Sequence, residues 1–154
     1  MTVTVEVETR IARPAADVFT AIVDVEHYPA WLIASGIVGV ERLDPGPLAA
    51  GARLRIRQTV AGRSTALDGI VTVLAPGAAF GLRGKDKDGV TIEIDAVLAP
   101  DELSTRLRWS LRIGLPFRYR VFESMVAPQA RRAAALDLEA FKRRLESGSD
   151  LGRP

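Results

Sequence analysis

Few side chains in this sequence can carry acid–base chemistry. His27 is the only histidine among the 154 residues, and histidine suits general acid–base work near neutral pH. A catalytic base also needs a partner that orients its ring, and no residue at a readable spacing supplies one. We therefore expect His27 to be a polar residue that closes a helix beside Tyr28 and Pro29.

Two carboxylates, Glu93 and Asp95, lie two positions apart and resemble a catalytic pair. They alternate with Ile92 and Ile94, so in a strand both carboxylates face away from the apolar side. Asp68 is expected to face outward for the same reason. These acids are predicted to be surface residues.

Motifs for covalent catalysis and for metal binding are missing from the sequence. Ser64 lies in no G-x-S-x-G elbow, and no base-plus-acid arrangement is close to it in the sequence. The absence of cysteine and the single histidine argue against a transition-metal site. G-P-L-A-A-G lacks the Lys-Ser/Thr that follows in a phosphate loop. We predict no catalytic residue, no metal and no cofactor.

Arginine recurs at alternate positions in a chain of net charge +2. Alternation of this kind is typical of the solvated face of a sheet, and a surface for an anionic partner is the alternative. Aromatic residues do not interleave with the arginines, which disfavours nucleic acid. The residues concerned are Arg53, Arg55, Arg57, Arg63, Arg106, Arg108, Arg112, Arg118 and Arg120.

The first 31 residues predict a strand followed by a short helix. Residues 3–11 alternate between apolar and polar, as in a half-buried strand. Pro14 suits the first turn of a helix, and Tyr28-Pro29 is expected to end it.

Six more strands are predicted between residues 37 and 113, over 37–43, 54–60, 64–74, 79–83, 90–98 and 107–113. Ala61-Gly62 and residues 85–89 are typical of hairpin turns. Seven strands at regular spacing indicate an antiparallel meander.

A helix is predicted from about Arg120 to Glu146, because the apolar residues from 130 to 145 step by three and four. Pro128 lies inside it, so the helix is either kinked there or starts there, and we favour one kinked helix. Residues 147–154 are expected to form a disordered tail.

Together these patterns predict an α+β fold within a single domain, residues 1–146. A curved seven-stranded antiparallel sheet wraps around the long C-terminal helix, with short helices after the first strand and an apolar hollow beneath the long helix. Gln58 stands on an apolar strand face, where it pairs with backbone or contacts a ligand. The candidate lining residues are Trp31, Ile56, Gln58, Leu82, Ile94, Trp109, Phe122 and Met125.

The chain resembles the START-like, or SRPBCC, superfamily of helix-grip proteins, in its polyketide cyclase/dehydrase and lipid-transport branch. The residues that carry the resemblance are the opening strand, the block P-A-A-D-V-F-T-A-I-V-D-V-E-H-Y-P-A-W from Pro14 to Trp31, and the Arg/Ala/Leu-rich C-terminal helix. The motif reports fold rather than chemistry, and members range from lipid carriers to polyketide cyclases and co-chaperones.

The resemblance and the apolar hollow imply a protein that binds a lipid, an isoprenoid or quinone, or an aromatic polyketide. An aromatase/cyclase-type enzyme and a protein-interaction module are the alternatives. No apolar stretch approaches the roughly 18 residues that span a bilayer, and the N-terminus is unlike a signal peptide, so a cytoplasmic protein is expected. Oligomeric state is left open.

Overall fold

The computed structural model describes residues 2–148, in which seven strands form one antiparallel sheet of order β1-β7-β6-β5-β4-β3-β2. This is the predicted meander, with its last strand returning beside its first. The elements in chain order are β1 (Thr2–Ile11), α1 (Ala15–Val23), η1 (Val25–Ala30), β2 (Ile37–Arg42), β3 (Arg53–Val60), β4 (Arg63–Ala75), β5 (Ala79–Lys85), β6 (Thr91–Asp101), β7 (Ser104–Gly114), η2 (Phe117–Phe122) and α2 (Glu123–Glu146).

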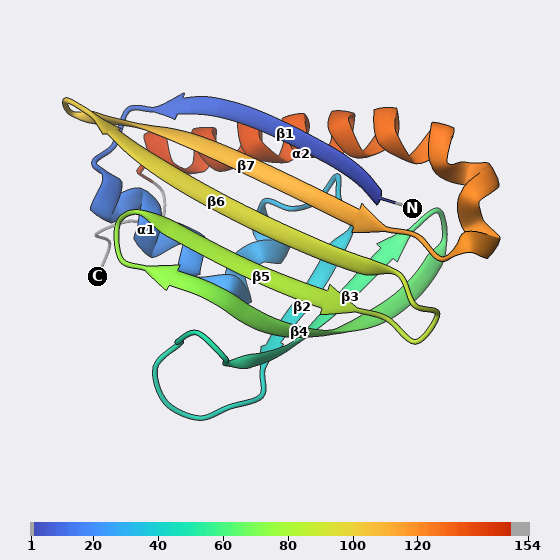
Figure 1. Cartoon of the computed structure of the whole chain (residues 1–154). Helices are drawn as coiled ribbons and strands as arrows, with labels where there is room; N and C mark the ends of the chain where they lie inside the picture. The colour runs from blue at the N-terminus through green and yellow to red at the C-terminus, as the bar shows by residue number, and fades with distance from the viewer. Residues whose placement is uncertain (1, 149–154) are drawn as a thin grey trace.

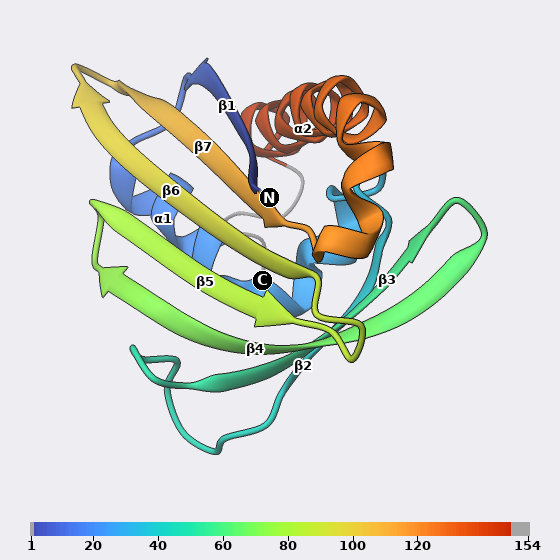
Figure 2. The ribbon, with the colours of Figure 1, turned by 45° about the vertical axis from the view of Figure 1, so that its right-hand side comes forward.

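The sheet curves around the long helix α2, and α1 and η1 lie on the same side of the sheet (Figures 1 and 2). The inward side chains of the strands meet the helices in one buried core, while the other face of the sheet is open to solvent. The predicted α+β helix-grip architecture is confirmed. No helix among residues 2–148 is long and apolar enough to cross a membrane.

The alternating arginines of β3 and β7 lie on the outer face of the sheet, as predicted. The remaining arginines of the predicted set do not: Arg63 begins β4 and pairs with Asp88, and Arg118 and Arg120 lie in η2. Arg108 is 3.0 Å from Glu6 across β7 and β1, and Arg112 is 3.4 Å from Glu93 across β7 and β6. These pairs are exposed, so each adds little to stability. The ion pair with Arg112 shows that Glu93 faces outward. Glu93 and Asp95 therefore do not form a buried catalytic pair.

The helix α1 ends at Val23, earlier than the predicted end at Tyr28-Pro29. Residues 25–30 form a 3₁₀ helix instead, in which the Tyr28 hydroxyl donates to the Ile22 carbonyl oxygen at 2.5 Å. Burial of this phenol, which is 3% exposed, raises its pKa. The proline therefore lies within a second, tighter helix and does not end the first one.

The C-terminal helix passes through Pro128 without a break, so it does not start there. It begins at Glu123, and the residues before it form the separate 3₁₀ helix η2, which shortens the predicted helix at its N-terminal end. Ser147 and Gly148 close it through hydrogen bonds to carbonyls of its last turn. The predicted tail otherwise falls on residues 149–154, which lie outside the described residues.

Asp137 ties α2 to the loop that follows η1. Its side chain is 2% exposed and accepts hydrogen bonds from the backbone N–H groups of Ala34, at 2.7 Å, and Ser35, at 2.9 Å. A buried carboxylate on an otherwise apolar helix face needs such partners. The sequence carried this signal, because Asp137 lies four residues before Phe141 on the apolar stripe, but our sequence analysis missed it.

We expect Asp137→Ala to lower the free energy of unfolding by about 1–3 kcal/mol, because it leaves two loop N–H groups without their acceptor. Urea unfolding followed by circular dichroism measures the loss. Glu139→Ala is the matched control, since Glu139 is exposed on the same helix. Equal stability of the two variants would contradict the structural role of Asp137.

Asp137 should also make stability depend on pH. Burial raises its pKa, against the opposing effect of the two N–H donors. Between the unfolded-chain pKa of about 3.9 and the raised pKa, the folded state binds the proton more tightly, so stability falls as pH rises through this window. Asp137→Asn removes the titration. Urea midpoints measured from about pH 4 upward should fall for the wild type relative to Asp137→Asn, and parallel pH profiles would refute the assignment.

Candidate ligand-binding site

An apolar cavity of about 280 Å³ lies between the concave face of the sheet and the N-terminal half of α2. It is lined from three sides: by the loop after η1, by inward residues of β3, β6 and β7, and by α2. The lining residues are Leu32, Ala34, Ser35, Ile37, Gln58, Val60, Val90, Ile92, Ile94, Trp109, Leu111, Ile113, Val126, Gln129, Ala130 and Ala133.

The hollow arises from the size of the side chains along α2. In the C-terminal half of the helix, Leu138, Phe141 and Leu145 are buried against the core. In the N-terminal half, the positions that face the sheet include Ala130 and Ala133, which are too short to reach it. Because these side chains are short, a cavity remains between this half of the helix and the sheet.

Behind the cavity, a cluster of buried aromatic rings holds Trp109, the ring of this cluster that borders the cavity. Trp31 of the η1 end packs edge-on against Trp109 of β7, with ring centroids 5.3 Å apart, and lies 4.5 Å from the Phe141 ring of α2. Tyr28 joins the group at 5.3 Å from Trp31. Edge-to-face contacts of this kind stabilise a core beyond their buried area. Trp109 therefore presents its surface to the cavity from a fixed position.

The polar groups of the lining are neutral: Ser35, Gln58 and Gln129. The Gln58 side chain donates from Nε2 to the Ser35 carbonyl oxygen at 2.9 Å. Gln58 thus pairs with backbone, one of the two alternatives left open by the sequence, and it also lines the cavity. Gly36 lets the loop approach β3 this closely. Its φ is +76°, and a Cβ at this position would lie 2.1 Å from the Thr59 carbonyl oxygen, so other residues are excluded.

Three of the predicted lining residues, Gln58, Ile94 and Trp109, border the cavity. Trp31, Ile56 and Leu82 are buried in the core and do not border it.

Phe122 and Met125 lie outside the cavity, 49% and 64% exposed. The prediction that they border the hollow therefore needs correction. Phe122 belongs to η2, before the long helix begins, and Met125 points away from the sheet while the next residue, Val126, points toward it.

His27 lies away from the cavity on the surface. Its Nδ1 is 2.7 Å from a carboxylate oxygen of Asp24, three residues earlier, and its side chain is 65% exposed. This is the helix-end position that the sequence indicated. Among residues 2–148 no group of three or more His, Cys, Asp or Glu side chains is arranged to hold a metal ion.

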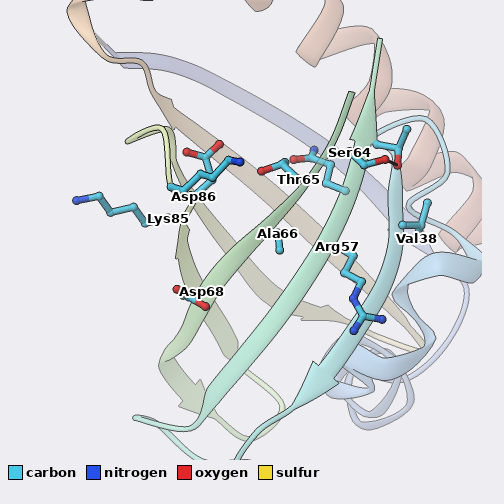
Figure 3. Close-up of a pocket in the computed structure, with 11 residues that line it drawn as sticks. Val38, Arg57, Ser64, Thr65, Ala66, Asp68, Lys85 and Asp86 are labelled. Atoms are coloured by element: carbon cyan, nitrogen blue, oxygen red, sulfur yellow. Dashed lines mark hydrogen bonds between the residues drawn. The ribbon is translucent and has the colours of Figure 1, made fainter. Parts of the chain in front are cut away.

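A second hollow, of about 770 Å³, lies on the outer side of the sheet over β3, β4 and the β5–β6 turn. Figure 3 shows Lys85 and Asp86 on one side of it, Arg57 and Val38 on the other, and Ala66 between them. Its lining carries both signs of charge and faces solvent. Such a surface does not exclude water from an apolar molecule, so the smaller inner cavity is the candidate site.

The end of the inner cavity lined by Val60, which is 44% exposed, and by Val90 is taken as its mouth, and a polar cluster beside it joins three segments. Arg63, at the start of β4, forms an ion pair with Asp88 of the β5–β6 turn. Arg118 of η2 donates to the Asp88 carbonyl oxygen at 2.5 Å. Hydrogen bonds from Arg118 and Arg63 lower the pKa of Tyr119. The cluster holds η2 against the two turns and so fixes where the cavity meets the outside.

The lining of this cavity is apolar apart from a few neutral polar groups. None of its residues carries an ionisable side chain, and of the three neutral hydrogen-bonding side chains Gln58 is joined to the backbone of Ser35 at the loop end. The arrangement can enclose an apolar molecule and orient one polar substituent, such as a hydroxyl or carbonyl oxygen.

Comparison with solved structures shows the same fold in proteins of low sequence identity. The protein TTHA0849 from Thermus thermophilus superposes with a TM-score of 0.77 at 17% identity, covering 96% of this chain and 99% of that one. The Zhui aromatase/cyclase from Streptomyces sp. R1128 gives 0.75 at 19% identity, covering 97% and 99%. A START superfamily protein from Mycobacterium smegmatis gives 0.67 at 20% identity, covering 94% and 95%.

Comparison with curated protein sequences gives no match. The sequence profile of the family described as "Polyketide cyclase / dehydrase and lipid transport" matches residues 2–146, nearly the whole described chain. The resemblance noted in the sequence is confirmed, and this chain belongs to the polyketide cyclase/dehydrase and lipid transport family.

Proposed function

We propose that this protein binds a small hydrophobic molecule in the cavity between the sheet and the N-terminal half of α2. The observation that carries the proposal is the cavity itself: an apolar volume with no ionisable residue in its lining. Membership of the family, which implies hydrophobic ligand binding, supports it.

The cavity limits the size of the ligand. A cavity of about 150 Å³ accommodates a benzene-sized molecule, whereas this one measures about 280 Å³. It suits a molecule of about two fused rings or a short isoprenoid or acyl chain, and a larger ligand would extend through the mouth. One polar substituent would lie within reach of Ser35, Gln58 or Gln129. A quinone, a prenyl alcohol and a bicyclic polyketide fragment all meet this description.

Mass spectrometry of the purified protein under native conditions tests the proposal directly. We expect a bound neutral molecule of low polarity that is released on denaturation. Purified protein that carries no ligand and that takes up no neutral aromatic probe would refute it.

An aromatase/cyclase-type reaction is the second candidate function. It is favoured by the neutral hydrogen-bond groups of the cavity lining, because a folded poly-β-keto chain can be oriented by such groups while the cavity shapes it. Positioning alone can provide a large rate enhancement. Turnover of a polyketide thioester analogue, reduced in a Gln58→Leu variant that still binds an apolar probe, would favour the enzyme over the carrier.

We expect Ala130→Phe to weaken binding of N-phenyl-1-naphthylamine more than tenfold, because the added ring occupies the cavity. Stability should be unchanged or higher, since the ring fills empty apolar space. Fluorescence titration measures the first and thermal unfolding the second. Ala135→Phe is the control, because Ala135 is exposed on the opposite side of the same helix. Wild-type affinity in Ala130→Phe would place the probe elsewhere.

Trp109→Ala should weaken binding of the same probe far more than His27→Ala does. The tryptophan borders the cavity and offers on the order of 150–250 Å² of apolar surface, whereas His27 lies at the surface. Circular dichroism first establishes that Trp109→Ala is folded. If His27→Ala abolishes binding or turnover while folded Trp109→Ala binds normally, the passive-container interpretation is wrong.

A further inference from the structure

Exposed apolar side chains are concentrated in one short segment of this protein. Of the twelve large apolar residues that are exposed between residues 2 and 148, four fall within nine consecutive positions of η2 and the first turn of α2. We name these four the mouth stripe: Phe117, 72% exposed, Val121, 70%, Phe122, 49%, and Met125, 64%. Side chains of this size clustered on a surface mark an interaction site.

The mouth stripe faces solvent, whereas neighbouring residues of the same segment face the protein. Phe117 and Val121 lie in the 3₁₀ helix η2 and Met125 lies in the first turn of α2, and all three are exposed. On the other side, Tyr119 joins the polar cluster at the mouth and Val126 lines the cavity. The segment is therefore held in place from within while its apolar side faces outward.

Positive charge surrounds the stripe. Residues 117–132 contain four arginines, Arg118, Arg120, Arg131 and Arg132, and one acid, Glu123. The Arg120 guanidinium lies over the Phe117 ring, 4.3 Å from its centroid. Arg132 follows Met125 by seven residues, close to two helical turns, and so lies on the same side of α2.

From this combination we propose that the mouth stripe docks on an anionic lipid bilayer. A short helical segment with Phe, Val and Met on one side and arginine beside them matches the composition of helices that lie in the membrane interface. Each arginine near an anionic surface adds electrostatic attraction to it. The arginine carbon chains can pack on the rings while the guanidinium groups contact phosphates at the same depth.

Charge complementarity favours a bilayer over a protein partner. The stripe lies on η2 and the first turn of α2, and η2 is at the end of the molecule where the β3–β4 hairpin and the β5–β6 turn also lie (Figures 1 and 2). A basic and apolar surface matches a partner that is negative at its surface and apolar a few ångströms below it, which describes an anionic leaflet.

Docking in this orientation brings the cavity to the membrane. Met125 of the stripe is followed directly by Val126 of the lining, so a lipid surface in contact with the stripe lies beside the mouth. The docking surface follows from the exposed side chains of the mouth stripe. It does not depend on which molecule the cavity holds. A hydrophobic ligand would nevertheless gain a route that avoids water.

Vesicle flotation tests the inference, with phosphatidylcholine vesicles and with vesicles that contain phosphatidylglycerol as well. We expect the wild-type chain to float with the anionic vesicles and to lose this binding at high salt. The triple variant Phe117→Ser, Val121→Ser, Met125→Ser should bind at least tenfold more weakly. Since all three residues are exposed, the variant should fold, which thermal unfolding establishes.

The matched control carries Val73→Ser, Val97→Ser and Leu103→Ser, three exposed apolar residues of the strands and the β6–β7 turn. It should bind vesicles within twofold of the wild type. Arg120→Gln with Arg132→Gln should weaken binding to anionic vesicles several-fold.

Absence of wild-type binding to anionic vesicles overturns the inference, as does an equal loss in the two triple variants. Binding of N-phenyl-1-naphthylamine in solution is measured on the same proteins. A chain that floats but takes up no probe would refute the cavity proposal and leave the docking surface standing.

Discussion

The cavity depends on one mismatch: a continuous 24-residue helix covers a curved sheet with large side chains along only part of its length. Where Leu138 and Phe141 face the sheet, the helix packs directly on the core, and Trp31 and Trp109 complete the contact. Toward its N-terminus the inward residues include the short Ala130 and Ala133, and space is left between the helix and the sheet. Packing of the C-terminal half of α2 thus sets the distance of its N-terminal half from the sheet. Because the packed half is dense, the helix does not move inward to fill the space.

Charge in this protein is kept away from that space. The arginines of β3 and β7 pair with acids on the outer face, His27 pairs with Asp24 at the surface, and the lining is apolar or neutral. The buried carboxylate of Asp137 uses both oxygens on the backbone of the loop that forms the cavity rim. The electrostatics therefore favour retention of an uncharged molecule over acid–base chemistry on it. Polar contacts position the walls and the apolar surface supplies the affinity.

The three similar structures share 17–20% identity with this chain, and what they share is the frame of seven strands and a long helix. A frame of this kind is set by the alternation of apolar residues, which many sequences satisfy. The contents of the cavity depend on a few inward side chains, such as Ala130 and Gln58, that can change without cost to the frame. The same fold can therefore serve carriers and enzymes, and function must be argued from the lining and the mouth.

Periodicity along the chain was sufficient to predict the architecture of this protein. Alternation predicted all seven strands, and the outward arginines and the inward Trp109 followed from it, because side chains of a strand point to opposite faces. The site was only partly predictable. Phe122 and Met125 were expected in the cavity and lie outside it, since the start of α2 and its rotation depend on how η2 is held by Arg63 and Asp88, far away in sequence. Asp137 meets its loop partners across about a hundred residues of chain, a pairing that no local pattern encodes. Local patterns determine which face of an element is apolar, whereas the length of a helix, its rotation and the space beneath it are decided by contacts between distant segments.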